Sequence, residues 1–90
     1  MYLFLGQDTV VSTRDIVGVF DLDKSSTSPL TKRFLREAQR QGRVVDVSPG
    51  ELPASFVVCE REGQSLVYLT QISVSTLKKR AGEEQLRIEN

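Results

Sequence analysis

The chain has no histidine, a single cysteine and only three prolines among its 90 residues, and its twelve basic residues are balanced by twelve acidic ones. Without histidine, Ser-His and Cys-His nucleophile pairs, imidazole acid-base catalysis and imidazole metal ligands are excluded. The cysteine, Cys59, cannot form an internal disulfide, and its place inside an apolar run predicts a buried, inert thiol. An enzyme is therefore the least favoured class of function.

Long apolar stretches and nucleotide-binding loops are also missing. No segment reaches membrane-spanning length, and the first six residues lack the basic leader, apolar region and cleavage site of a secretory signal. We therefore expect a cytoplasmic protein that does not contact a membrane. The glycines are scattered, neither G-x-x-x-x-G-K-[ST] nor G-x-G-x-x-G occurs, and zinc-ligand spacing is absent, so no cofactor is expected.

The apolar and β-branched runs indicate a single β-rich domain, since no linker or repeat divides the chain. They predict six short strands, at Tyr2–Leu5, Thr9–Ser12, Asp15–Phe20, Arg43–Val47, Ser55–Cys59 and Ser65–Thr70. Several strands have apolar residues on both faces. Ile16 and Phe20, for example, alternate with Val17 and Val19, so both faces of the sheet must be covered.

Two helices accompany these strands and complete an α+β domain. Ser28 is a favourable N-cap whose hydroxyl can accept from the first free amides, Pro29 suits the first helical position, and Gly42 suits the end. The helix has an apolar side, formed by Leu30, Phe34, Leu35 and Ala38, and a cationic side, formed by Lys32, Arg33, Arg36 and Arg40. A shorter helix is predicted from Ser73 or Ser75 to Arg80, anchored by Leu77.

One long and one short helix do not suffice to cover both faces of a six-stranded sheet. Each valine or phenylalanine left exposed forgoes about 1.5–3 kcal/mol, a large share of the stability of a small domain. We therefore expect another copy of the chain to cover exposed sheet surface or a sheet edge. The sequence thus predicts a homo-oligomer.

The basic residues are concentrated in two blocks although the net charge is zero. The first block runs from Lys32 to Arg43, and the second is Lys78, Lys79 and Arg80. One interpretation is a solvated surface, with Arg33 and Glu37 paired at i,i+4 and the cations complementing the carbonyl ends of the helices. The other is a locally positive surface on which a polyanion docks. The sequence leaves both interpretations open.

Asp21 and Asp23 are the only candidates for a metal site. On an extended segment the two carboxylates would share one face, as a magnesium site requires. The run Asp21-Leu22-Asp23-Lys24-Ser25-Ser26 is, however, more typical of a strand end entering a turn, and further ligands are scarce. No metal is therefore expected.

Three pieces of the chain are similar to a known family: MYLFLGQDTVVSTRDIVGVFD from Met1 to Asp21, SFVV from Ser55 and STLKKRA from Ser75. In order and spacing they resemble the RemA/RemB family of bacterial extracellular-matrix regulators, more closely its RemB branch. The resemblance implies one RemA/RemB-like domain over residues 1–81, followed by an acidic C-terminal tail over residues 82–90. It also implies a small regulator of biofilm-matrix genes and, from the RemA branch, a ring-forming protein that binds DNA.

The sequence departs from the family pattern in two places. Arg14 is displaced by one position, with Asp15 where the arginine of the RemA branch is expected, and a one-residue offset in a strand turns a side chain to the other face. The adjacent arginines that follow the loop glycine in RemA-like proteins are absent, since Gly50 is followed by Glu51 and Leu52. Binding by the same surface as in the RemA branch is therefore not expected.

The sequence favours an oligomeric transcriptional regulator that contacts the phosphate backbone of double-stranded DNA through a repeated basic surface. The candidate contacts are Arg14, Lys78, Lys79 and Arg80, together with the helix cations Lys32, Arg36 and Arg40. The alternative is a protein-interaction adaptor without DNA contact, which the missing loop arginines favour.

Overall fold

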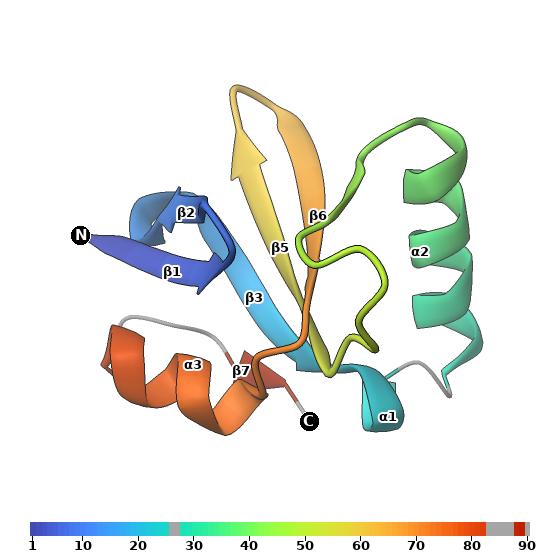
Figure 1. Cartoon of the computed structure of the whole chain (residues 1–90). Coiled ribbons are helices and arrows are strands. Elements are labelled where there is room, and N and C mark those ends of the chain that lie inside the picture. Colours follow the sequence, from blue (N-terminus) through green and yellow to red (C-terminus); the bar gives the residue numbers. More distant parts are fainter. Residues whose placement is uncertain (26–27, 83–87, 90) are drawn as a thin grey trace.

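The computed structural model of the chain describes residues 1–25, 28–82 and 88–89, and it consists of two sheets flanked by helices (Figure 1). The strands β1 (Tyr2–Gly6) and β2 (Thr9–Ser12) form an antiparallel hairpin. A five-stranded sheet has the order β4-β6-β5-β3-β7, with bounds Val44–Asp46, Gln64–Thr70, Ser55–Arg61, Ile16–Asp21 and Ile88–Glu89. The helical segments are η1 (Thr13–Asp15), α1 (Leu22–Ser25), α2 (Pro29–Arg40) and α3 (Val74–Ala81).

The predicted α+β class, with one long and one short helix, is confirmed, and all six predicted strands are present. The expectation of one six-stranded sheet is wrong, because β1 and β2 pair only with each other. Strand β7 and the single turn α1 were not predicted. The division into a domain over residues 1–81 and a tail over 82–90 stays a prediction, since most of that tail (residues 83–87 and 90) lies outside the described residues.

One face of the five-stranded sheet is covered by the β1–β2 hairpin and α3 (Figure 1). Leu3 and Leu5 of the hairpin and Leu77 of α3 are fully buried against Val19 and Val57 of the sheet. A buried hydroxyl connects these layers: Thr70 Oγ1 donates to the Leu5 carbonyl (2.6 Å) and accepts from the Ile72 amide (3.1 Å). The hairpin therefore forms a separate layer rather than an extension of the sheet.

The opposite face is covered by α2. Ala38 of this helix is buried against Phe56, Val58 and Val67, and the rings of Phe20 and Phe56 stack with centroids 4.9 Å apart. The predicted apolar side of α2 is only partly used, because Leu30 remains 72% exposed and Phe34 37% exposed. The N-terminal half of α2 therefore presents apolar surface to solvent.

The helix boundaries follow the predicted capping residues with one difference. Helix α2 begins at Pro29 and ends before Gly42, whose φ of +73° suits glycine, but the Ser28 side chain forms no capping hydrogen bond. Ser73, and not Ser75, is the N-cap of α3, because the Ser73 hydroxyl accepts from the Thr76 amide (3.3 Å). None of the helices in the described part of the chain has the length and apolar character needed to span a bilayer.

A β-bulge at Val17 changes which residues share a face of β3. Ile16 lies opposite Cys59 whereas Gly18 lies opposite Val58, so Val17 is the extra residue of the bulge. Ile16 consequently packs on the α3 side together with Val19, whereas Phe20 packs on the α2 side. The prediction that Ile16 and Phe20 share a face is therefore wrong.

The layer arrangement also corrects the burial argument for oligomerisation. Both faces of the sheet are covered within one chain, by the hairpin and α3 on one side and by α2 on the other. The exposed apolar side chains that remain include Val17, Leu30 and Phe34 beside α2, and others elsewhere, such as Tyr2 and Val10 on the hairpin and Leu66 on β6. The homo-oligomer stays a prediction that now depends on this smaller surface.

Candidate nucleic-acid interface and the adjoining pocket

Helix α3 carries the second basic block on its last turn. Val74, Leu77 and Ala81 bury one side of the helix in the core, which fixes the direction of the neighbouring side chains. Lys78 lies one turn after Val74 and is half-buried, whereas Lys79 is exposed. The three cations therefore differ in accessibility although they are consecutive in the sequence.

Arg80 is held against β1. Its Nη1 lies 3.5 Å from the Phe4 carbonyl oxygen, and its guanidinium carbon lies 5.8 Å from the centroid of the Phe4 ring. A guanidinium at this distance from a ring is attracted by the ring quadrupole. The charge of Arg80 thus has a defined position on the surface where α3 meets the hairpin.

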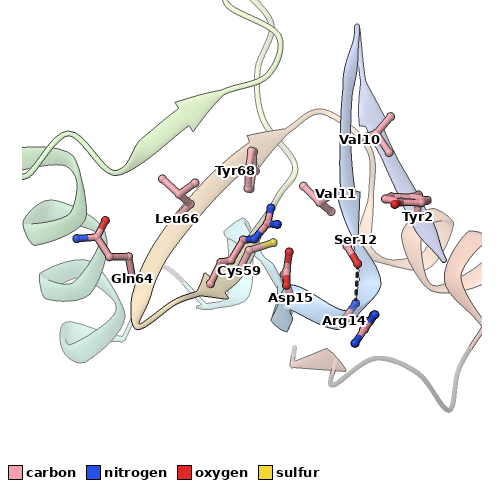
Figure 2. Close-up of a pocket in the computed structure, with 11 residues that line it drawn as sticks. Tyr2, Val10, Val11, Ser12, Arg14, Asp15, Cys59, Gln64, Leu66 and Tyr68 are labelled. Carbon is pink, nitrogen blue, oxygen red and sulfur yellow. Dashed lines mark hydrogen bonds between the residues drawn. The ribbon is translucent and has the colours of Figure 1, made fainter.

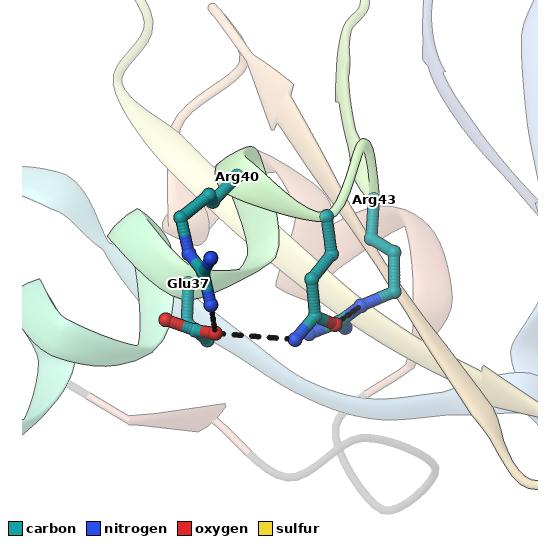
Figure 3. Close-up of polar contacts among 4 residues, drawn as sticks. Glu37, Arg40 and Arg43 are labelled. Carbon is teal, nitrogen blue, oxygen red and sulfur yellow. Dashed lines mark hydrogen bonds and ion pairs between the residues drawn. The ribbon is translucent and has the colours of Figure 1, made fainter.

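The cations of α2 are not equivalent either, and Figure 3 shows Arg40 paired with Glu37 near the end of the helix. Arg40 pairs with Glu37, which also accepts from the Gln41 amide group (3.2 Å), and the hydrogen bond from Arg40 holds the pKa of the Glu37 carboxyl below its usual value. The predicted pairing of Glu37 with Arg33 is therefore wrong, because Arg40 takes this place. Lys32 and Arg36 are exposed on the same helix.

Arg43, the last cation of the first block, has a structural role. Its Nη1 donates to the carbonyl (3.1 Å) and hydroxyl oxygens of Ser65, and its Nε donates to Gln41 (2.8 Å). These bonds connect the end of α2 to the beginning of β6. The guanidinium of Arg43 is therefore occupied by hydrogen bonds within the fold.

Arg14 lies in η1, where its amide donates to the Ser12 hydroxyl (3.3 Å), and its side chain lines a pocket of about 700 Å³. The pocket brings Arg14 together with Asp15 and with Arg61 of β5, whereas the α3 cations are not among its lining residues. Arg61 was not predicted as a site residue. A signal was present in Glu62-Gly63, a turn dipeptide that places Arg61 at a strand end.

Burial and the nearby Asp15 carboxylate raise the pKa values of Cys59 and Tyr68 in this pocket. Burial raises the pKa of the Cys59 thiol to about 11, and the charge of Asp15 adds to this increase. Burial also raises the pKa of the Tyr68 hydroxyl, with smaller contributions from Cys59 and Asp15. The predicted burial of the cysteine is confirmed, and a thiol with this pKa carries almost no thiolate at neutral pH.

The structure also shows the loop after Gly50, which lacks the arginines of the RemA branch, and the Asp21 and Asp23 pair considered for a magnesium site. Gly50 adopts a φ of +90°, and the following residues Glu51 and Leu52 are exposed. Asp21 ends β3 whereas Asp23 lies in α1, so the extended geometry considered for a magnesium site is not present. Within residues 1–25, 28–82 and 88–89, no three His, Cys, Asp or Glu side chains are grouped to hold a metal ion.

Comparison with known proteins gives the family of the chain. The model of RemA-like proteins, described as Extracellular matrix regulatory protein A-like, matches residues 3–81. The chain belongs to the RemA-like family. A relative in this group, Extracellular matrix regulatory protein B of Bacillus subtilis (strain 168), is 46% identical over 81 residues, which cover 90% of each chain.

These matches confirm the predicted membership in the RemA/RemB family and the similarity to its RemB branch. Both the family and the relative are named as regulatory proteins of the extracellular matrix, and neither is named as an enzyme. As a RemA-like protein, the chain is a member of a group of extracellular matrix regulators.

Proposed function

We propose that this RemA-like protein is an oligomeric transcriptional regulator of extracellular-matrix genes that contacts the phosphate backbone of double-stranded DNA. Its family supports the regulatory role. The DNA contact is supported by the basic block of α3, Lys78, Lys79 and Arg80, which lies on a helix anchored in the core. This block is the observation that carries the proposal.

The geometry of the α3 block favours phosphate contact. Val74, Leu77 and Ala81 fix the backbone of α3, and Arg80 lies against Phe4, so the helix and the Arg80 side chain lose little conformational entropy when they meet an anion. Lysine and arginine contacts with phosphates position a protein on the duplex without reading the base sequence. Recognition by shape and charge is therefore the expected mode.

Repetition of the block supplies affinity that one subunit lacks. The chain has no net charge, so a single copy gains nothing from overall attraction to DNA. In an oligomer the second and later contacts with one duplex are intramolecular, and each phosphate neutralised adds to the salt dependence. Arg14 on η1 is the additional contact that we assign to this surface. The exposed α2 cations Lys32 and Arg36 lie on the opposite side of the sheet, so we assign them to a separate contact with DNA.

The oligomer is supported by an apolar groove between α2 and the sheet. The groove has a volume of about 330 Å³ and is lined almost entirely by apolar side chains: Val17, Phe20, Leu30, Thr31, Phe34, Phe56 and Val58. A partner that covers Leu30 and Phe34 would remove their apolar surface from water, which is favourable. A second copy of the chain is the occupant in this proposal.

The same groove favours the second candidate function, a protein-interaction adaptor without DNA contact. In that case a different protein would cover Leu30 and Phe34, and the α3 cations would form a solvated surface. Glu51, in the loop where RemA-like proteins carry arginines, would repel a phosphate and agrees with this alternative.

Fluorescence anisotropy of labelled duplex DNA distinguishes the two functions. The protein, with its assembly state established by light scattering, is titrated into the duplex at two salt concentrations. Tight binding that falls steeply with salt supports the DNA regulator, because each phosphate contact releases counterions. No binding at low salt from an assembled oligomer rejects DNA contact and leaves the adaptor.

A further inference from the structure

A pocket of about 700 Å³ lies where the β1–β2 hairpin ends short of the longer β5–β6 hairpin. One face of β5 and β6 presents three cross-strand pairs, Val57 with Tyr68, Cys59 with Leu66 and Arg61 with Gln64. The first pair lies beneath the β1–β2 hairpin, and exposure increases toward the tip, where Arg61 and Gln64 are exposed. The β1–β2 layer therefore stops before the end of β5 and β6, and the open space is the pocket.

The polar side of this Arg14–Arg61 pocket is positively charged. Two guanidinium groups, from η1 and β5, line it together with the single carboxylate of Asp15. Among residues 1–25, 28–82 and 88–89, no carboxylate forms an ion pair with Arg14 or Arg61. Arginine binds carboxylate and phosphate in a bidentate manner, which makes an anion the complementary ligand.

The other side of the pocket is apolar and aromatic. Figure 2 shows Leu66 and Tyr68 along β6 and Tyr2, Val10 and Val11 on the hairpin. Val11 points from the hairpin toward Tyr68, whereas Tyr2 and Val10 lie on the outer face of the hairpin (Figure 2). Val11, Leu66 and Tyr68 together present a largely apolar surface that suits a planar ring. The volume of about 700 Å³ lies in the range of small-molecule sites.

We propose that the Arg14–Arg61 pocket binds a small organic anion that joins one phosphate or carboxylate group to a planar ring. Arg14 and Arg61 hold the anionic group, and Val11, Leu66 and Tyr68 contact the ring. The carboxylate of Asp15, whose charge reaches Cys59 and Tyr68, faces the same space and accepts from a hydroxyl or amino group of the ligand.

A bound anion also has a consequence for DNA. Arg14 is one of the phosphate contacts proposed above, and it cannot serve a ligand and a duplex together. Occupation of the pocket therefore weakens DNA binding and gives the regulator a small-molecule input. This consequence alone rests on the proposed function, whereas ligand binding does not.

The two tyrosines provide a direct test, because the chain has no others and both line the pocket. The full chain, labelled at its tyrosine rings, is titrated by NMR without DNA, using adenosine monophosphate and 4-hydroxybenzoate as the phosphate and carboxylate probes. Inorganic phosphate and adenosine test the two halves of the ligand separately. We expect saturable shifts of the Tyr68 ring signals with at least one complete probe, smaller shifts of the outward-facing Tyr2, and weaker binding of each half.

Three variants complete the test. Arg61→Gln and Arg14→Gln each reduce the affinity about tenfold, because each removes charge-assisted hydrogen bonds. Arg33→Gln removes the same type of side chain from an exposed position outside the pocket and leaves the affinity unchanged. The proposal is overturned if neither complete probe shifts the tyrosine signals, or if both pocket variants bind as tightly as the unmodified protein. Either result leaves the DNA proposal intact, since no DNA is present.

Discussion

The guanidinium of Arg80 lies over the ring of Phe4, with its carbon 5.8 Å from the ring centroid, and this contact joins the end of α3 to the β1 strand. The two residues are 76 positions apart in the sequence. Because the contact positions one cation of the proposed DNA surface, its strength bears on function as well as on stability.

A double-mutant cycle measures this contact. Phe4→Leu keeps an apolar side chain but removes the ring face, and Arg80→Gln removes the charge. We expect a coupling free energy of about 0.5–1 kcal/mol from urea unfolding of the single and double variants. Strictly additive effects would show that the contact contributes nothing to stability.

The α3 block is tested by Lys78→Ala/Lys79→Ala/Arg80→Ala in the anisotropy titration. We expect weaker DNA binding and a salt dependence that is less steep by about one unit of slope per lost phosphate contact. Lys32→Ala/Arg36→Ala reports on the α2 cations by the same measurement. An unchanged slope in the triple variant would remove α3 from the interface.

The apolar groove is tested by Leu30→Glu, which places a charge where a second copy is proposed to pack. We expect a smaller assembly in light scattering, because burying the carboxylate is unfavourable. Leu52→Glu is the control, since Leu52 is 90% exposed and does not line the groove. The same mass for both variants, or a monomeric unmodified protein, contradicts the proposed oligomer.

Arg43 is expected to matter for stability and not for ligand contact. Arg43→Gln removes the hydrogen bonds from the guanidinium to Ser65, and we expect a loss of about 1–2 kcal/mol in the free energy of unfolding. Arg33→Gln is the matched surface variant and should change it by less than about 0.5 kcal/mol. The measurement is urea denaturation, and equal midpoints would show that the Arg43 bonds do not hold α2 to β6.

The raised pKa of Cys59 predicts a loss of stability at alkaline pH. The unfolded thiol ionises near its usual pKa of about 8.5. The folded thiol retains its proton up to about pH 11. Between these values the folded state binds more protons, so the free energy of unfolding declines as pH rises. Tyr68 contributes in the same direction because its pKa is also raised.

The matched variant for this prediction is Cys59→Ala. It should be less stable at neutral pH, because a buried side chain is truncated, but it should show a smaller decline between about pH 8.5 and pH 11. Unfolding curves across this range measure both effects. An equal decline in the two proteins would assign the pH dependence to other groups.

The extent to which the sequence predicted the site differs from residue to residue. Lys79 was correctly expected at the surface, because its place on an amphipathic helix follows from periodicity. The partner of Glu37 was predicted wrongly, because Arg40 and Arg33 lie on the same helix and compete for this carboxylate. The partner of Arg80 was not predicted, because Phe4 is remote in the sequence. Arg61 became a candidate only because the tertiary structure places it among the residues that line the same pocket as Arg14.

The sequence by itself determined the six strands β1 to β6, both main helices, the buried thiol and the family. Alternating and β-branched runs define strands, and capping residues define helix ends, by interactions between near neighbours. The tertiary structure alone decided that the β1–β2 hairpin forms a separate layer, that the bulge at Val17 changes the faces of β3, and that two arginines share one pocket. These features depend on how distant segments pack and pair, and strand pairing is not encoded in the periodicity of any one segment.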